Sequence, residues 1–217
     1  LFFFTNFERT KETFPTTNNI GTAESKLDKE EVDKVIQKVS QLANGYNAGG
    51  YGLTDVDTYS NKFLARIDWN INQKNKFTMR YSLLDARSMN FSLQPAGGRL
   101  NDNGYYMNNS THSLVGELNS QFKSSLANEL RLGWTRVRDY RDPIGQALPY
   151  IKINNMSGGT SLELGTERFS MANALDQDIF TLTDNLTWTV GNHAVTFGTY
   201  NEFFKMANLY IANGYGS

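Results

Sequence analysis

The sequence is short of several residue types, and each shortage removes a class of protein. It has no cysteine, which excludes a disulfide scaffold, a cysteine-ligated zinc site and a thiol enzyme. Its two histidines, His112 and His193, lie far apart in the chain, which disfavours a histidine-based metal centre. No stretch approaches the roughly 18 to 20 uninterrupted apolar residues of a spanning helix, and the mean hydropathy is -0.50. A helical membrane protein is therefore excluded.

The sequence also has no excess of positive or negative charge. Lys and Arg number 21 against 22 Asp and Glu, giving a formal net charge of -1, so no nucleic acid is expected as a partner. The sequence contains no P-loop, dinucleotide fingerprint, nucleophile elbow or zinc-helix motif. Residues 55–57 and 101–103 offer oxygen ligands without the full ligand spacing of a calcium loop. We therefore expect no enzyme activity, no cofactor and no metal.

What is present suits strands joined by polar turns. Only 4 prolines accompany 18 glycines, 24 asparagines and 28 aromatic residues, a mixture of strand formers and turn formers. From Lys62 to Leu83, apolar and polar residues alternate on both sides of a polar turn, which predicts a β-hairpin. Similar hairpins are predicted over 114–135 and 180–199, and an opening strand runs from Phe2 to about Arg9, giving seven strands.

One residue interrupts this regularity. Asp184 falls on the apolar side of its predicted strand. We expect a bulge, a slip in register or a local hydrogen-bonding partner there.

The connections alternate strictly in length. Short ones fall at 73–76, 123–127 and 190–192, and long ones at about 11–58, 89–108 and 141–175. The first long connection contains a predicted helix, Leu27 to Leu42, which Ser25 or Asp28 can cap. Long strands with short turns at one end and long loops at the other are typical of a transmembrane β-barrel. All the long loops should then lie on one side, and protease should cut only these in intact cells.

A soluble β-sandwich shows the same alternation of apolar and polar residues, so we consider the sandwich and the transmembrane barrel together. Charged polar faces, aromatic residues near strand ends and the loop asymmetry favour the barrel. In a barrel the apolar residues should face lipid: Phe63, Ile67, Trp69, Phe77, Met79, Leu118, Leu130, Leu132 and Trp188. The residues expected to face the lumen are Arg66, Asp68, Arg80, Glu117 and Arg131.

Two strand-turn-strand segments and the opening strand also resemble a known family. Residues 61–72 with 75–82, residues 184–198 and residues 1–8 are similar to barrel strands of TonB-dependent outer-membrane transporters, with the Oar-like branch of Bacteroidetes as the closest group. The resemblance implies a barrel of about 22 strands around an N-terminal plug, together with a segment that contacts TonB. Neither plug nor TonB segment is found in this sequence, so the chain is expected to be a piece of a longer protein.

The fold class expected is therefore all-β: a fragment, of about seven antiparallel up-and-down strands, of a large transmembrane barrel with long extracellular loops and one short loop helix. Residues 1–217 would form part of a single outer-membrane barrel domain in the cell outer membrane. Expected partners are outer-membrane lipid, the TonB complex through a missing N-terminal segment, and a surface lipoprotein. Expressed alone, the piece should aggregate in water, because both sheet edges and the apolar face would be uncovered.

The expected function is uptake of a bulky substrate such as a peptide, glycan or chelate. Loop tyrosines flanked by Gly and Asn are the substrate-binding candidates, namely Tyr46, Tyr51, Tyr105, Tyr106 and Tyr150. The same rings could instead pack the loops on one another. Two other functions remain open: a soluble or surface β-sheet binding module, and a passive porin or adhesin barrel.

Overall fold

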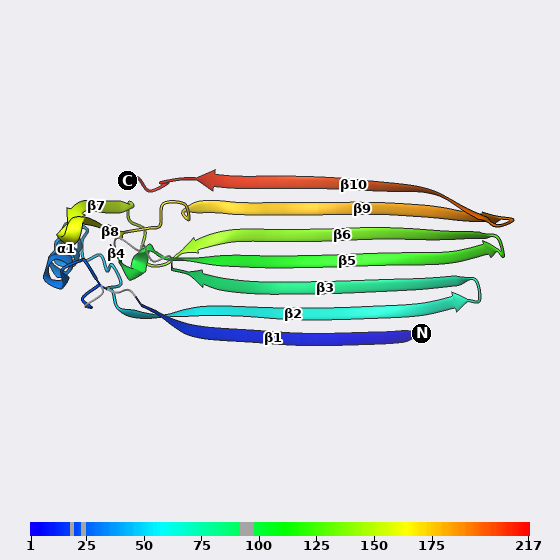
Figure 1. Cartoon of the computed structure of the whole chain (residues 1–217), viewed down its shortest axis with the longest axis horizontal. Helices are drawn as coiled ribbons and strands as arrows, with labels where there is room; N and C mark the ends of the chain where they lie inside the picture. The colour runs from blue at the N-terminus through cyan, green and yellow to red at the C-terminus, as the bar shows by residue number, and fades with distance from the viewer. Residues whose placement is uncertain (18–19, 23–24, 92–97) are drawn as a thin grey trace.

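The chain divides into a long sheet and a small folded body at one end of it (Figure 1). The computed structural model describes all residues except 18–19, 23–24 and 92–97. In this described part of the chain, no helix combines the length and apolar content that a membrane crossing requires.

Seven strands form the long sheet, as predicted. Their order is β1-β2-β3-β5-β6-β9-β10, and every neighbouring pair is antiparallel. Within the described residues the sheet does not close, so β1 and β10 are its edges. The strands are β1 (Phe2–Thr17), β2 (Leu53–Asn72), β3 (Asn75–Asn90), β5 (Tyr105–Lys123), β6 (Leu126–Pro143), β9 (Ala172–Val190) and β10 (His193–Ile211).

The strands are longer than predicted, at 16 to 20 residues each. β1 continues through Pro15, opposite Asp55 of β2, rather than ending near Arg9. A proline is compatible with an edge strand, where one row of backbone groups has no ladder partner. The three long connections therefore span only 18–52, 91–104 and 144–171. The predicted boundaries 11–58, 89–108 and 141–175 were wrong because cross-strand pairing carries the ladder beyond the regular alternation.

The two kinds of connection lie at opposite ends of the sheet, as predicted. The tight turns β2–β3, β5–β6 and β9–β10 gather at one end, and the long connections gather at the other (Figure 1).

The long connections fold together instead of forming separate loops. Residues 20–52, 98–104 and 144–171, so far as described, form one body that we call the cap. It contains α1 (Lys29–Leu42), β4 (Gly98–Arg99), β7 (Ile151–Met156), β8 (Thr160–Leu164) and two short 3-10 helices, Asn101–Asn103 and Ser157–Gly159. A three-stranded sheet of order β4-β8-β7 joins the second and third connections. The sequence did not predict this sheet.

Helix α1 begins two residues later than predicted. Asp28 is the N-cap, and its Oδ1 accepts a hydrogen bond of 3.0 Å from the Glu31 amide. Gly45 follows the helix end with a φ of 85°, a conformation that glycine adopts without strain. The apolar stripe of the helix packs inward, with Val32 fully buried.

The cap holds the main cluster of buried apolar side chains. Its members come from all three connections, which fixes the connections relative to one another. They are Ile20, Leu27, Val32, Tyr46, Ala48, Leu100, Met156, Leu162 and Leu164.

Candidate functional site

The strand register gives the long sheet two chemically different faces. Residues directly opposite each other on neighbouring strands project to the same side of a sheet. One such row is Ile67, Met79, Gly116, Leu132 and Leu182. The next row, on the other side, is Arg66, Arg80, Val115, Gly133 and Thr181. We call these sides the apolar face and the polar face.

The register groups these residues on the two faces as the alternation predicts, while the assignment of the polar face to the lumen stays a prediction. All nine apolar residues expected together share the apolar face, and Arg66, Asp68, Arg80, Glu117 and Arg131 share the polar face. The apolar face is not covered by any other part of the described chain: Leu132 is 55% exposed and Phe180 is 58% exposed.

The apolar band has the height of a membrane. On β9 it extends from Phe180 to Val190, ten residue steps, or about 33 Å along a strand at about 3.3 Å per residue. A strand tilted by about 40° spans about 25 Å of height over that length, which is the usual apolar band of an outer-membrane barrel. The interruption at Asp184 involves no register shift. Its Oδ1 accepts a hydrogen bond of 2.8 Å from Asn128 Nδ2, so the predicted local partner is the correct alternative.

The band crosses the strands obliquely. At the cap end of β2 the band still includes Phe63. The residues in the same cross-strand row on β6 and β9 are charged, namely Arg136 and Asp178, so on those strands the band ends further from the cap. A band that shifts along the sheet from strand to strand is expected when strands are tilted against the membrane normal.

The polar face carries a network of paired charges. Arg66 donates to both carboxylate oxygens of Asp68, at 2.7 and 2.8 Å. Arg131 bridges Glu117 of β5 at 2.7 Å and Glu129 at 3.3 Å. Pairs at this exposure contribute little stability, so their main effect is to make this face hydrophilic.

A groove of about 380 Å³ lies among these charges. Its lining is Arg66, Lys76, Thr78, Arg80, Val115, Glu117, Asn119 and Arg131. Arg80 lies directly opposite Arg66, and within the described residues no carboxylate is close enough to Arg80 to form an ion pair. The groove can therefore attract an anionic group.

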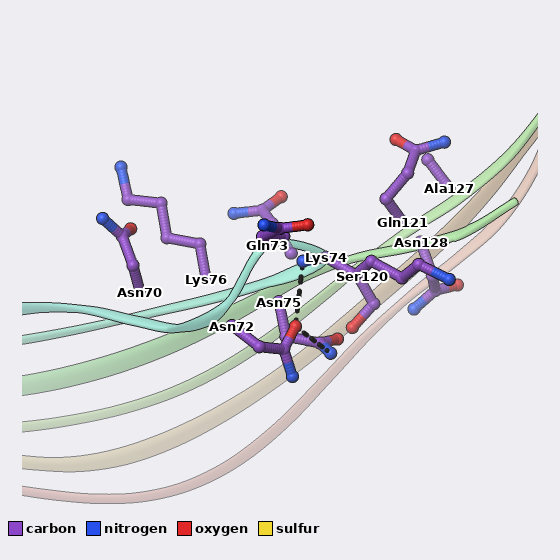
Figure 2. A pocket seen from close by; sticks show the side chains of 11 residues that line it. Asn70, Asn72, Gln73, Lys74, Asn75, Lys76, Ser120, Gln121, Ala127 and Asn128 are labelled. Carbon is purple, nitrogen blue, oxygen red and sulfur yellow. Dashed lines mark hydrogen bonds between the residues drawn. The ribbon is translucent and has the colours of Figure 1, made fainter. Parts of the chain in front are cut away.

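A second depression, of about 620 Å³, lies at the tight-turn end and is rich in amides (Figure 2). It is lined by Asn70, Asn72, Gln73, Lys74, Asn75, Lys76, Asn119, Ser120, Gln121, Ala127 and Asn128. Asn72 Oδ1 accepts hydrogen bonds from the Lys74 amide at 2.8 Å and Asn75 Nδ2 at 3.0 Å, which orders the turn (Figure 2). Side-chain amides both donate and accept, so this end can contact sugars or peptide groups. This depression was not predicted from the sequence, although the density of Asn over 70–75 was a usable signal.

The five candidate tyrosines do not share one environment. Tyr46 is buried in the cap core, and its hydroxyl donates to Asp102 Oδ2 at 2.5 Å. Tyr51 donates to Asp33 of α1 at 2.7 Å. Tyr150 lies 5.9 Å beneath the Arg168 guanidinium.

The other two tyrosines lie in a strand and not in a loop. Tyr105 and Tyr106 begin β5 and project to opposite faces. The Arg141 guanidinium lies 4.4 Å from the Tyr105 ring, and that of Arg87 lies 3.5 Å from the Tyr106 ring. Substrate binding by the five tyrosines stays a prediction.

Asp102 joins all three connections of the cap. Its Oδ2 accepts from Tyr46 of the first connection and from the Gly165 amide of the third, the latter at 2.9 Å. Burial raises the pKa of Asp102 to about 6, although both hydrogen bonds favour the ionised form. The Oδ1 atoms of Asn101, Asp102 and Asn103 are buried and have no hydrogen-bond partner within the described chain. Among the described residues, no group of three His, Asp or Glu side chains is placed to hold a metal.

A sheet with one apolar face of membrane height, one charged face and folded connections at a single end defines the wall of a transmembrane β-barrel. Residues 5–217 match the family described as an outer membrane beta barrel domain, so the chain belongs to that family and resides in the outer membrane. No curated protein and no solved structure matches the chain significantly. The predicted fold class and location are confirmed. Membership of this family rules out the soluble binding module. The family match does not show that the protein is TonB-dependent or Oar-like.

Proposed function

We propose that the chain forms part of the wall and the outer cap of a TonB-dependent transporter that takes up a bulky substrate, such as a peptide, glycan or chelate. Residues 1–217 would belong to one barrel domain whose polar face lines the lumen. Its partners would be outer-membrane lipid, the TonB complex through a separate N-terminal segment, and a surface lipoprotein. The proposal includes no enzyme activity, cofactor or nucleic acid.

The observation that carries the proposal is the folded cap at one end of a charged wall. Three connections share a buried core and a buried carboxylate, so they present a stable surface above the lumen. A stable surface can recognise a large ligand before it enters. The resemblance of residues 61–82 to transporter strands supports the same function.

Further strands would complete the barrel. Single-chain bacterial barrels have an even number of strands, from 8 upward, whereas the described sheet has seven. The edge strands β1 and β10 would then each pair with a strand from elsewhere in the full protein, and the polar face would enclose the lumen.

A passive porin or adhesin barrel is the second candidate, and the paired charges of the polar face favour it. A face on which Arg131 bridges Glu117 and Glu129 is compatible with a water-filled channel. The two candidates differ in whether a plug closes the lumen.

Liposome swelling with the full-length protein separates the two candidates. A plugged transporter should leave liposomes impermeable to arabinose and raffinose, whereas a porin should make them swell. Liposomes without protein and liposomes with a general porin provide the controls. In a second arm, the full-length protein in detergent should bind the purified periplasmic domain of TonB. Rapid sugar flux, or failure to bind that domain, would contradict the transporter.

A further inference from the structure

Strand β1 separates its charges by face just beyond the apolar band. Glu8 and Glu12 project to the polar face, and Glu8 pairs there with Lys62 at 2.7 Å. Arg9 and Lys11 project to the opposite side, the outer surface of the barrel wall. The segment is nearly neutral in sequence, and the separation becomes visible because β1 continues beyond Arg9 to Thr17.

Four hydrogen-bond donors meet on this outer surface. Arg9 lies directly opposite Asn61 of β2, and Lys11 lies directly opposite Tyr59. Both cations are exposed. Within the described chain, none of the four side chains makes a hydrogen bond or an ion pair. By contrast Arg138, on the same side of the wall, donates to both oxygens of Asp178 at 2.8 and 3.0 Å.

The four donors lie at the height expected for the boundary between the hydrocarbon layer of the membrane and the lipid headgroups. The outward row immediately below them is Phe7, Phe63 and Leu83, the last apolar row of β1, β2 and β3. Lipid phosphates lie just outside the apolar layer, and basic residues near an anionic membrane surface attract them. Tyrosine is also favoured at this level.

The unpaired cations of the patch fit a phosphate. The next strand adds Asp85 beside Asn61 and Arg87 beside Tyr59. Arg87 pairs with Asp142 at 4.0 Å, and Asp57, one row beyond Tyr59, accepts a hydrogen bond of 2.7 Å from Thr13. Arg9 and Lys11 are therefore the cations of the patch that have no ion pair within the described chain. Guanidinium and ammonium groups form charge-assisted hydrogen bonds with phosphate oxygens, and the Asn61 amide and Tyr59 hydroxyl supply neutral donors.

We propose that Arg9, Lys11, Tyr59 and Asn61 form a site for the phosphate of an outer-membrane lipid headgroup. Pairing of β1 with a further strand would use the free backbone edge of β1 and would keep Arg9 and Lys11 on the outer surface, because side chains point out of the plane of a sheet. The site follows from the barrel and its membrane, and it does not depend on TonB coupling.

Lipid retention by the full-length protein tests the site. The double variant Arg9→Gln/Lys11→Gln removes both cations, and Lys34→Gln/Lys38→Gln makes the same charge change at exposed positions of the cap helix. Each protein is purified in neutral detergent and titrated with short-chain phosphatidylglycerol, with binding followed by native mass spectrometry. Each basic residue near a membrane surface contributes about 1 kcal/mol, so the site variant should bind about 30-fold more weakly while the helix variant binds like the wild type.

Three results would overturn the proposal: equal binding by wild type and site variant, equal loss in both double variants, or competition by inorganic phosphate at the concentration of the lipid. A shift in electrophoretic mobility on heating reports whether each variant folds. Should the double variant fail to fold, Asn61→Asp adds one negative charge beside Arg9 and should also weaken lipid binding. Unchanged binding by that variant would equally count against the site.

Discussion

The cap and the long sheet use the same apolar residue types in opposite ways. In the cap, Leu100, Leu162 and Leu164 are fully buried. In the sheet, Leu132, Phe180 and Phe197 are each more than half exposed. The cap is organised as a small water-soluble domain, with its apolar groups inside, whereas the sheet presents them outward in a band. The contrast shows that the two regions are built for different solvents.

The two regions should therefore respond differently to the same kind of change. In the cap a lost methyl group leaves a cavity. On the outer surface of the sheet, lipid chains can fill the space, but a charge has no water to solvate it.

The largest effect is expected from Leu162→Ala in the cap core. Truncation of a fully buried leucine costs about 2–5 kcal/mol, so the cap should open while the strands stay protected. Hydrogen exchange of the full-length protein in detergent measures this region by region. Leu42→Ala, at a position 75% exposed, should change cap protection little. Equal loss of protection in cap and strands would show that they unfold as one unit.

Charge on the apolar face should have the next largest effect. Leu132→Arg places a cation within the band and should destabilise the inserted barrel by about 2–4 kcal/mol. Thr181→Arg, on the polar face and opposite Glu202, is the matched control and should be tolerated. Folding into lipid vesicles, followed by the heat-dependent shift on gels, compares the two. Equal tolerance of both arginines would remove the distinction between the faces.

The pH dependence of the cap should follow Asp102. Burial raises the folded-state pKa from 3.8 to about 6, so folding disfavours the charged carboxylate. The stability contribution is complete below about pH 4 and is lost as the pH rises through about 6, by up to about 3 kcal/mol. Asp102→Asn should abolish this slope in cap opening measured by hydrogen exchange. A wild-type cap that becomes more stable between pH 4 and 6 would contradict the assignment.

The smallest effect is expected at the start of α1. Asp28→Ala removes the acceptor for the Glu31 amide and should cost about 1 kcal/mol of cap stability. Lys34→Ala, at an exposed position of the same helix, serves as the control. The ratio of amide exchange rates in the first turn of α1 gives the comparison, and a larger effect at Lys34 would reverse the expected order.

The sequence predicted the long sheet well and the cap poorly. Period-two alternation through Phe63, Ile67 and Phe77 reports a local property, the face of a strand, so strands and faces could be derived from it. The cap depends on contacts between distant segments, such as Leu100 with Glu163 at 2.9 Å between backbone atoms. Strands as short as the two residues of β4 leave no periodic pattern. Of the elements of the cap, only α1 was predicted, because its apolar stripe and its N-cap are patterns within one short stretch of sequence.

The candidate site shows the same limit. The face of Arg66, Asp68 and Arg131 could be predicted because each falls on a fixed side of a regular strand. Tyr46 was chosen for its neighbours in sequence, but its partner Asp102 lies 56 residues away, beyond what local composition reports. The donors at Arg9 and Lys11 were missed because the opening strand was expected to end at about Arg9.

The shared core of the cap also determines how another molecule can recognise it. Tyr46, Asp102 and Gly165 are held together only in the folded state, so the surface above them is assembled from three distant stretches of chain. An antibody raised against the folded cap should recognise a discontinuous epitope and lose it on denaturation. Linear peptides copied from any single connection should then be poor immunogens for the native protein.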